Sequence, residues 1–293
     1  MVKGTSKQQG KPHGVVKKVH VKDSGKNEKK SGNQDTSTAI EEDQWYTASS
    51  DMTALRRMVR EWQGQRDLSC LDLFGASGAV KRTWARHHKK AELYDIKNYG
   101  LEHDICSEGG FKNLLQLGLR IKDGGIIVAG PPCSLFIFLS SPIHRRSPER
   151  PWGNTNYRSV RLANFIVHNM TTFLQLMSER GVEWVIEQPS GSGMFRLPPL
   201  QQLMSKVAAS QVTTYMGCFG HKMMKRTMLV GTLPLLHNME RSLRGEERQR
   251  FREMQKNFYV RCDGKVRGEK ALQASADYTS EFCEALYSCW LTK

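Results

Sequence analysis

The sequence contains no long hydrophobic run and no apolar segment near its first residue. A membrane-spanning helix needs about 20 consecutive apolar residues, and a secretory signal peptide needs an apolar stretch close to the N-terminus. We therefore expect neither a membrane protein nor a secreted one. The seven cysteines are odd in number and include no Cys-x-x-Cys pair, which argues against a disulfide framework and a zinc site. These absences favour a reducing, intracellular compartment and no bound metal.

Acidic residues are scarce relative to basic ones. The chain has 29 Asp and Glu against 44 Lys and Arg, so its formal net charge is +15, and its isoelectric point is about 9.6. A surplus of this size favours a polyanionic partner, and nucleic acid is the leading candidate. A basic soluble protein without such a partner is the alternative. The composition does not indicate an oligomeric state.

Large apolar residues are nearly absent from residues 1–43, which are rich in Lys, Gly, Ser, Asn and Gln. Nine lysines fall within the first 30 residues, against Asp23 and Glu28 as the only acids there. This composition predicts a disordered basic arm. Such an arm would hold phosphates or act as a nuclear localisation signal, and a merely solvating tail is the alternative.

Signals for strands and helices alternate over most of residues 44–293. Short apolar strand patterns end near Phe74, Ile96, Cys106, Ala129 and Gln188, and a final strand pair covers Val212–Phe219 and Thr227–Gly231. Helical periodicity separates most of these strands and is longest over Ser159–Arg180. The alternation predicts one α/β domain with a doubly wound, mostly parallel sheet.

The segment Gly130-Pro131-Pro132-Cys133 follows a short run of β-branched residues. The two prolines cannot donate ladder hydrogen bonds, so the strand must end there. Cys133 is therefore expected just past the carboxyl end of a central strand, where open α/β sheets bind their ligands.

A small-residue turn, Phe74 to Gly78, follows the first strand and precedes a helix. Such a turn lets a cofactor approach the backbone at the helix N-terminus. Asp95 ends the next strand, where a carboxylate can bind ribose hydroxyls, and Asp104 ends the third. A capped turn with two solvated aspartates is the alternative interpretation.

Several motifs across residues 68–231, taken in their order along the chain, resemble those of the DNA (cytosine-5) methyltransferase family. The matching segments are Leu71–Phe74 with Gly78, Asp95, His103–Ile105, Gly130–Cys133, Ile186–Pro189 and Lys225–Gly231. The resemblance implies a Rossmann-like methyltransferase fold, with a seven-stranded sheet whose last strand is antiparallel. It also implies S-adenosylmethionine as the cofactor and DNA, in preference to RNA, as the substrate.

The resemblance also implies roles for individual residues. Cys133 would be the nucleophile, Glu187 would hold the cytosine ring, and Arg226 would hold its O2 atom. The residues implied to bind the cofactor lie at the strand ends: Asp72, Phe74, Gly75, Ser77, Gly78, Asp95, Asp104, Ile105 and Pro131.

These residue types suit the reaction chemically. C5 of cytosine is a weak nucleophile until a thiolate adds to C6, and a cysteine thiolate needs positive charge nearby to form. A carboxylate such as Glu187 can stabilise the charge that builds up as sulfur adds. Methylation of an amino group is disfavoured, because enzymes of that kind resemble a pattern of a polar residue, Pro-Pro and an aromatic residue, and Gly130 and Cys133 supply neither the polar residue nor the ring.

A basic loop follows Cys133 and carries five arginines against Glu149 as its only acid. Arginines neutralise phosphates and interleaved aromatic rings stack on bases, which predicts a substrate lid over the site; a plain spacer is the alternative. The residues expected to contact nucleic acid are Arg145, Arg146, Arg150, Trp152, Arg158 and Arg161, with Lys225 from a later strand.

The C-terminal part departs from the family pattern. The motif-bearing core ends at Gly231, and the basic extension 232–293 is too short for the usual target-recognition domain. Its last segment, Tyr278 to Leu291, is expected to form an amphipathic helix that docks on the sheet. Two further hypotheses therefore remain: an RNA cytosine-5 methyltransferase, and an inactive nucleic-acid-binding protein that retains the fold.

Overall fold

The computed structural model describes residues 45–255, 259–262, 265–268 and 277–292. The chain divides into two units, residues 1–38 and residues 39–293. All described residues belong to the second unit, and the predicted basic arm 1–43 lies outside them.

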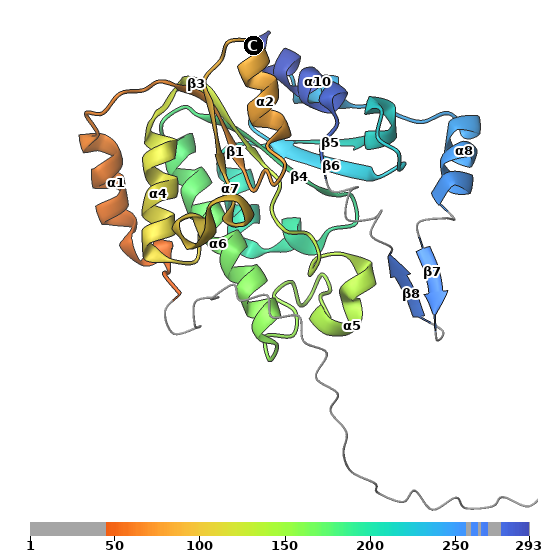
Figure 1. The fold of residues 1–293 in the computed structure, drawn as a ribbon. Coiled ribbons are helices and arrows are strands. Elements are labelled where there is room, and N and C mark those ends of the chain that lie inside the picture. The colour runs from red at the N-terminus through yellow and green to blue at the C-terminus, as the bar shows by residue number, and fades with distance from the viewer. Residues whose placement is uncertain (1–44, 256–258, 263–264, 269–276, 293) are drawn as a thin grey trace, which may run out of the picture. The chain divides into compact units, whose positions relative to one another are not determined.

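The second unit is an α/β domain built on a mixed six-stranded sheet of order β2-β1-β3-β4-β6-β5 (Figure 1). Strands β2, β1, β3 and β4 are parallel, whereas β6 lies between β4 and β5 and is antiparallel to both. This arrangement is compatible with a Rossmann-like fold. The strands are β1 (Leu68–Leu73), β2 (Ala91–Tyr94), β3 (Ile121–Ala129), β4 (Glu183–Pro189), β5 (Ser210–Tyr215) and β6 (Arg226–Gly231).

The main sheet of the described residues has six strands, and the seven strands that the family resemblance implies are not confirmed. The segment expected to form a strand at His103–Cys106 instead ends the 3-10 helix η3 (Gly100–His103) and enters a turn. The reason is local hydrogen bonding: Asp104 Oδ1 accepts from the Cys106 amide at 2.9 Å, and Ser107 caps α4 (Glu108–Leu119) through its hydroxyl. The second strand also ends earlier than expected, because Asp95 caps the short helix α3 (Ile96–Tyr99).

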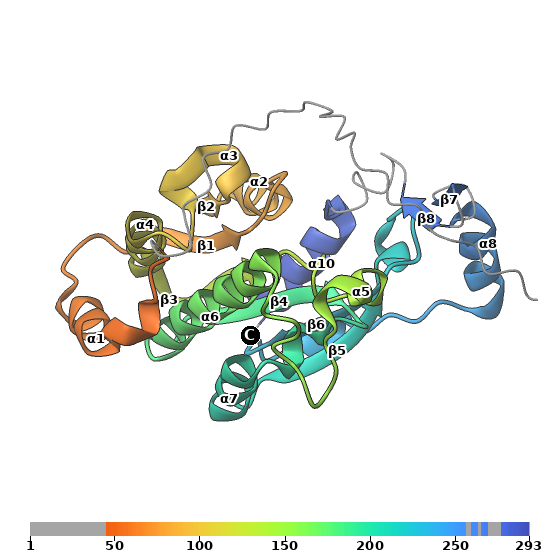
Figure 2. The same ribbon diagram turned by 90° about the horizontal axis from the view of Figure 1, so that it is seen from below.

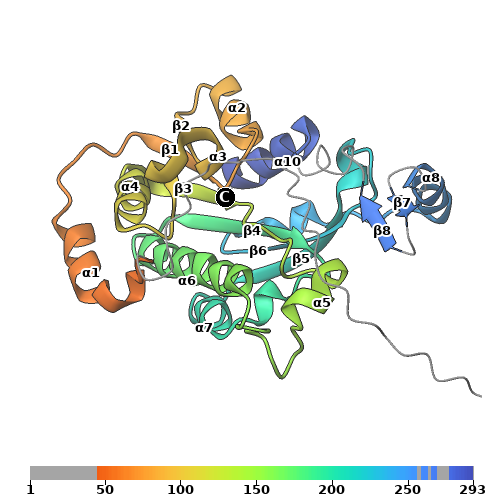
Figure 3. The ribbon, with the colours of Figure 1, turned by 60° about the horizontal axis from the view of Figure 1, so that its bottom comes forward.

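One face of the sheet is covered by α4, α6 (Arg158–Ser178) and α7 (Pro198–Lys206) (Figure 3). Apolar residues recur at helical spacing along α6, so one side of this helix is buried against the sheet. Leu71, Ile127 and Trp184 are among the strand residues that point into this layer. The first helix, α1 (Met52–Glu61), adds Leu55 to the same core.

The opposite face is covered by α2 (Ala79–Arg86) and α10 (Ser280–Leu291). Here Cys70, Ile126 and Val185 point into the layer, one position along each strand from the residues that face α6. This alternation is the period-two pattern of strands buried on both faces. Figure 2 shows α2 and α3 beside β2 at one edge of the sheet and α7 beside β5 at the other.

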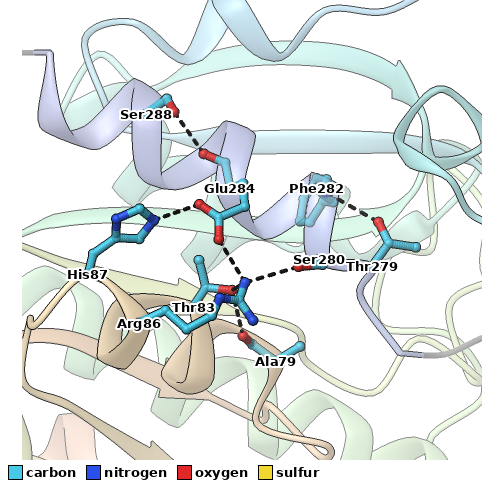
Figure 4. Close-up of polar contacts among 9 residues, drawn as sticks. All are labelled: Ala79, Thr83, Arg86, His87, Thr279, Ser280, Phe282, Glu284 and Ser288. Carbon is cyan, nitrogen blue, oxygen red and sulfur yellow. Dashed lines mark hydrogen bonds and ion pairs between the residues drawn. The ribbon is translucent and has the colours of Figure 1, made fainter.

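The amphipathic helix predicted for the C-terminal segment is present as α10 and docks on α2 and the sheet, as expected (Figure 4). Glu284 accepts hydrogen bonds from Arg86 Nη2 at 2.7 Å and pairs with His87 Nε2 at 2.7 Å. Thr279 caps the helix by accepting from the Phe282 amide at 3.2 Å. This docking holds the residue just before the cap, Tyr278, against the strand ends.

The remaining elements lie outside the main layers. They are α5 (Ser141–His144), α8 (Gly245–Gln255) and a two-stranded hairpin, β7 (Tyr259–Cys262) with β8 (Lys265–Gly268). Both α8 and the hairpin belong to the basic extension that follows Gly231.

Candidate active site

The carboxyl ends of the parallel strands meet at one edge of the sheet. Leu73 at the end of β1 is in register with Ala129 at the end of β3, and Ala129 with Ile186 of β4. The chain segments that follow these positions therefore lie next to each other, as predicted. The antiparallel strand β6 starts at the same edge, where Thr227 is in register with Pro189.

Cys133, Glu187 and Lys225 form the centre of this edge. Lys225 Nζ lies 3.6 Å from Glu187 Oε1. Glu187 is a buried residue, and no group among the described residues donates a hydrogen bond to this oxygen. Burial raises the pKa of the Cys133 thiol, the Glu187 carboxylate raises it further, and Lys225 opposes them. Lys225 is therefore a nearby group that favours ionisation of the thiol.

The cation beside Glu187 is Lys225, whereas the sequence assigned this position to Arg226. Lys225 directly precedes β6 and has a φ of 33°, so it lies outside the extended strand. Its side chain reaches Glu187, whereas Arg226, the first residue of β6, is exposed. The roles expected for these two neighbours are therefore exchanged.

Tyr278 is a site residue that the sequence reasoning missed. Its hydroxyl donates to Glu187 Oε2 at 3.2 Å. A Cβ atom added at Gly130 would lie 2.6 Å from this hydroxyl, so the tyrosine passes directly over the Gly-Pro-Pro turn. Burial raises the pKa of Tyr278 well above its usual value, and Glu187 adds to the effect. The available signal was its place directly before the Thr279 cap of a docking helix.

Asp72, near the end of β1, has a buried carboxylate. Asp72 Oδ2 accepts from the Lys81 amide at 3.1 Å, whereas Oδ1 is buried without a partner. Burial raises the Asp72 pKa to about 6, and the nearby charge of Asp95 also raises it. An unpartnered buried acceptor at the start of a helix is the kind of group that a bound ligand would satisfy.

The backbone of the turn that follows β1 is unusual. Phe74 and Ala76 have positive φ values of 59° and 40°, a conformation that is uncommon for non-glycine residues and is concentrated at functional sites. Gly78 donates its amide to the Gly75 carbonyl at 2.8 Å, and the Ser77 carbonyl accepts from the Arg82 guanidinium. The turn is therefore fixed by its own hydrogen bonds.

The other two predicted acids are Asp95, directly after β2, and Asp104, directly after η3. Asp95 Oδ2 accepts from the Ala76 amide at 2.9 Å and Oδ1 from the Lys97 amide at 2.8 Å, so this carboxylate ties the turn to β2. Asp104 is half-buried, which raises its pKa, and Ile105 is fully buried. The capped-turn interpretation thus describes the protein contacts of Asp95, and leaves each oxygen able to accept a further bond.

The segment around Cys133 is tied to β4. Gln188 Nε2 donates to the Pro131 carbonyl at 2.7 Å, and Ser192 donates to Gln188 Oε1 at 2.9 Å. Gly193 donates its amide to the Phe136 carbonyl at 2.7 Å. These contacts hold the Cys133 turn next to Glu187.

The predicted basic loop is folded back on itself. Arg146 is half-buried, with Nε donating to the Leu135 carbonyl at 2.8 Å and Nη1 to the Pro151 carbonyl at 2.6 Å. Its guanidinium also lies 4.2 Å from the ring centre of Phe136, so Arg146 stabilises the loop through contacts within it. Burial lowers the Arg146 pKa to about 10.

The other arginines of the loop differ in position. Arg145 and Arg150 are exposed and line a hollow together with Trp152. Arg158 lies over the ring of Trp45, with 5.6 Å to the ring centre, and Arg161 donates to the Thr155 carbonyl. Arg145 and Arg150 are therefore the arginines of this loop with the most open access to a ligand.

The structure bears on the membrane and metal expectations only through the residues that it describes. Among the described residues, no helix is long and apolar enough to cross a membrane. In that same part of the chain, no three His, Cys, Asp or Glu side chains cluster closely enough to hold a metal ion.

No protein-family model matches the chain, and no curated protein is similar to it at a significant level.

Proposed function

We propose that this protein transfers a methyl group from S-adenosylmethionine to C5 of cytosine in nucleic acid, with DNA favoured over RNA. The observation that carries the proposal is the environment of Cys133: a thiol at a strand end beside the Glu187–Lys225 pair, in which Glu187 Oε1 is buried without a hydrogen-bond donor. A Rossmann-like methyltransferase fold is part of the same proposal. So is a nuclear location, on the basis of the lysine-rich N-terminal sequence.

The Cys133 sulfur would add to C6 of the cytosine ring. A carbon–sulfur bond forms, and the electron pair of the C5–C6 double bond becomes available at C5. Once C5 carries the methyl group, loss of its proton expels the sulfur and restores the double bond. Glu187 Oε1 would accept from the exocyclic amine and stabilise the ring as sulfur adds.

Lys225 would assist in two ways. Its ammonium group favours the thiolate of Cys133, since it lowers the thiol pKa that burial and Glu187 raise. It also lies within reach of the ring that Glu187 would hold. The O2 contact first assigned to Arg226 therefore passes to Lys225 in this proposal, and Arg226 would contact the phosphate backbone.

The strand-end residues fit the methyl donor. Asp72 Oδ1 is a buried acceptor without a partner, which a cationic or hydrogen-bonding group of a ligand would satisfy. Asp95 and Asp104 would bind its hydroxyl and amine groups, with the Ile105 amide, the Pro131 turn and the backbone of Phe74–Gly78 around it. When bound, S-adenosylmethionine supplies an electrophilic methyl group.

Nucleoside analysis tests this proposal. The full chain is incubated with S-adenosylmethionine and with single-stranded DNA, duplex DNA or RNA, and the product is digested and separated by chromatography. We expect 5-methylcytosine from the native chain and none from Cys133→Ser. A methylated base other than 5-methylcytosine, or an equal yield from Cys133→Ser, would contradict the proposal.

A second candidate function is binding of nucleic acid without catalysis. It is favoured by the Tyr278 hydroxyl, which already occupies Glu187 Oε2 and lies over the Gly130 turn. This function predicts salt-dependent nucleic-acid binding with no affinity for the cofactor. Binding of S-adenosylmethionine in the micromolar range, measured by calorimetry, would exclude it.

A further inference from the structure

The loop that follows α5 forms an open hollow of about 450 Å³, within the size range of small-ligand sites. Its lining includes Arg145, Arg150, Trp152, Asn154, Thr155 and Asn156, with Glu149 as its one acidic residue. None of these residues takes part in the chemistry proposed for Cys133. The hollow is therefore a separate feature of the same loop.

The hollow is built by contacts that hold its walls in place. Asn164 Nδ2 donates to the Trp152 carbonyl at 3.0 Å, and the Asn154 amide donates to the His144 carbonyl at 2.7 Å. Gly153 between them has φ +71°, and a Cβ there would lie 2.4 Å from the His144 carbonyl. Because the backbone conformation requires glycine and is already hydrogen-bonded, a ligand would bind with little loss of loop entropy.

The charges at the hollow match an anionic ligand. Among the interactions of the described residues, neither the Arg145 nor the Arg150 guanidinium takes part in an ion pair or a hydrogen bond. The Glu149 carboxylate accepts from the Ser147 hydroxyl, and this contact lowers its pKa. Two arginines thus remain available to a phosphate group.

The rest of the lining matches a base. Trp152 is a residue 39 % exposed, and its indole is the ring available for stacking in this lining. Asn154 Oδ1 accepts from the Asn156 backbone amide at 3.2 Å, which leaves the Asn154 Nδ2 group and the Asn156 side-chain amide to bond the polar edge of a base. A phosphate-binding pair, a stacking ring and two amides in one hollow are the groups that recognise a nucleotide.

We propose that this hollow binds one unpaired nucleotide of a nucleic-acid strand, next to the base that enters the Cys133 site. The loop carrying it is joined to the Cys133 segment, because Arg146 donates to the carbonyl of Leu135, two residues past the cysteine. The inference rests on the nucleic-acid substrate of the proposed function. It does not depend on catalysis or on the cofactor.

The test is equilibrium binding of a fluorescent single-stranded oligodeoxynucleotide to the full chain, without cofactor, over a series of salt concentrations. Trp152→Ala should weaken binding about 5- to 100-fold, the range expected for loss of one stacked base. Trp152→Phe should restore most of the affinity. The control is Tyr157→Ala, since Tyr157 is in the same loop and is 48 % exposed but does not line the hollow.

The contribution of charge is tested with Arg150→Gln. Its control is Arg60→Gln, which removes an exposed arginine on α1. Arg150→Gln should reduce the slope of log affinity against log salt by about 0.7, the value for one contact to a single strand, and Arg60→Gln should leave it unchanged. Trp152→Ala should leave the slope unchanged as well. Thermal melting confirms that each variant is folded.

Three results would overturn the proposal. The first is native affinity in Trp152→Ala together with a native salt slope in Arg150→Gln. The second is an equal loss of affinity in Tyr157→Ala. The third is binding of a free mononucleotide as tight as that of the oligonucleotide, which would assign the hollow to a soluble nucleotide. Each is independent of 5-methylcytosine formation, so failure of this proposal is distinct from failure of the proposed function.

Discussion

The hydroxyl of Tyr278 donates a hydrogen bond of 3.2 Å to Glu187 Oε2, joining two residues 91 positions apart in the sequence. Tyr278 stands directly before α10, and the docking of that helix on α2 holds it there. The C-terminal extension thus supplies a group to the centre of the candidate site. One carboxylate oxygen of Glu187 is fixed by the tyrosine, and the other faces Lys225.

This contact predicts that Tyr278→Phe slows reaction at Cys133. Without the hydroxyl, Glu187 Oε2 loses its donor, and a hydrogen bond to a charged group contributes about 1.5–3 kcal/mol. We expect the rate of attack on a bound oligonucleotide to fall at least about tenfold while oligonucleotide affinity is unchanged. Tyr287→Phe, on the same helix, is the control and should react at the native rate. A native rate in Tyr278→Phe would show that the hydroxyl has no positioning role.

The charges around Cys133 predict opposite shifts of its thiol pKa. Burial and the Glu187 carboxylate raise this pKa, and Lys225 lowers it. Glu187→Gln should therefore lower the thiol pKa and Lys225→Gln should raise it. The measurement is the pH dependence of alkylation at Cys133, followed by mass spectrometry of the peptide that contains it. Shifts of the same sign in both variants would be inconsistent with this arrangement.

The buried Asp72 predicts a pH-dependent change in stability. Burial raises its folded pKa to about 6, whereas the unfolded value is about 3.9. Its contribution is therefore fully present below about pH 4 and is lost as pH rises through 6. Asp72→Asn should make the protein more stable at pH 7 by about 1–3 kcal/mol, with little gain at pH 4. Urea unfolding at the two pH values measures the difference, and an equal gain at both would contradict the assignment.

Close packing between Gly130 and Tyr278 predicts a non-additive pair of substitutions. A Cβ at position 130 would lie 2.6 Å from the tyrosine hydroxyl but 3.5 Å from the ring carbon that carries it. Gly130→Ala should cost about 1–3 kcal/mol of stability, the usual range for overpacking. In the Tyr278→Phe background the same change should cost much less, since the clashing atom is gone. Additive costs in a double-mutant cycle would place the strain elsewhere.

The sequence predicted the features of the fold that depend on local chemistry. Proline at 131 and 132 ends β3, and short continuous apolar runs mark the strands buried on both faces. The strand expected at His103–Cys106 was wrong because Asp104 and Ser107 satisfy that backbone as caps and turns. Short apolar segments do not reveal such competition until the side-chain geometry is known.

The candidate site was predicted less completely. The sequence does not reveal that Lys225, and not Arg226, pairs with Glu187, because Lys225 lies just outside β6 with a φ of 33° and strand alternation does not set the direction of its side chain. The place of Tyr278 before the cap of a docking helix was visible in the sequence, but its contact with Glu187, 91 residues away, depends on how α10 docks. The sequence predicted that Arg146 contacts nucleic acid. Its side chain instead packs against Phe136, and its guanidinium donates to carbonyl groups inside the loop.

The most direct measurement of the central claim is covalent trapping of Cys133. The full chain is incubated with S-adenosylmethionine and an oligonucleotide containing 5-fluorocytosine, in which fluorine replaces the hydrogen that must leave C5. Intact mass spectrometry should show one species equal to the chain plus the oligonucleotide plus one methyl group, and Cys133→Ala should show none. Absence of this species with the native chain, or an equal amount with Cys133→Ala, would contradict the account.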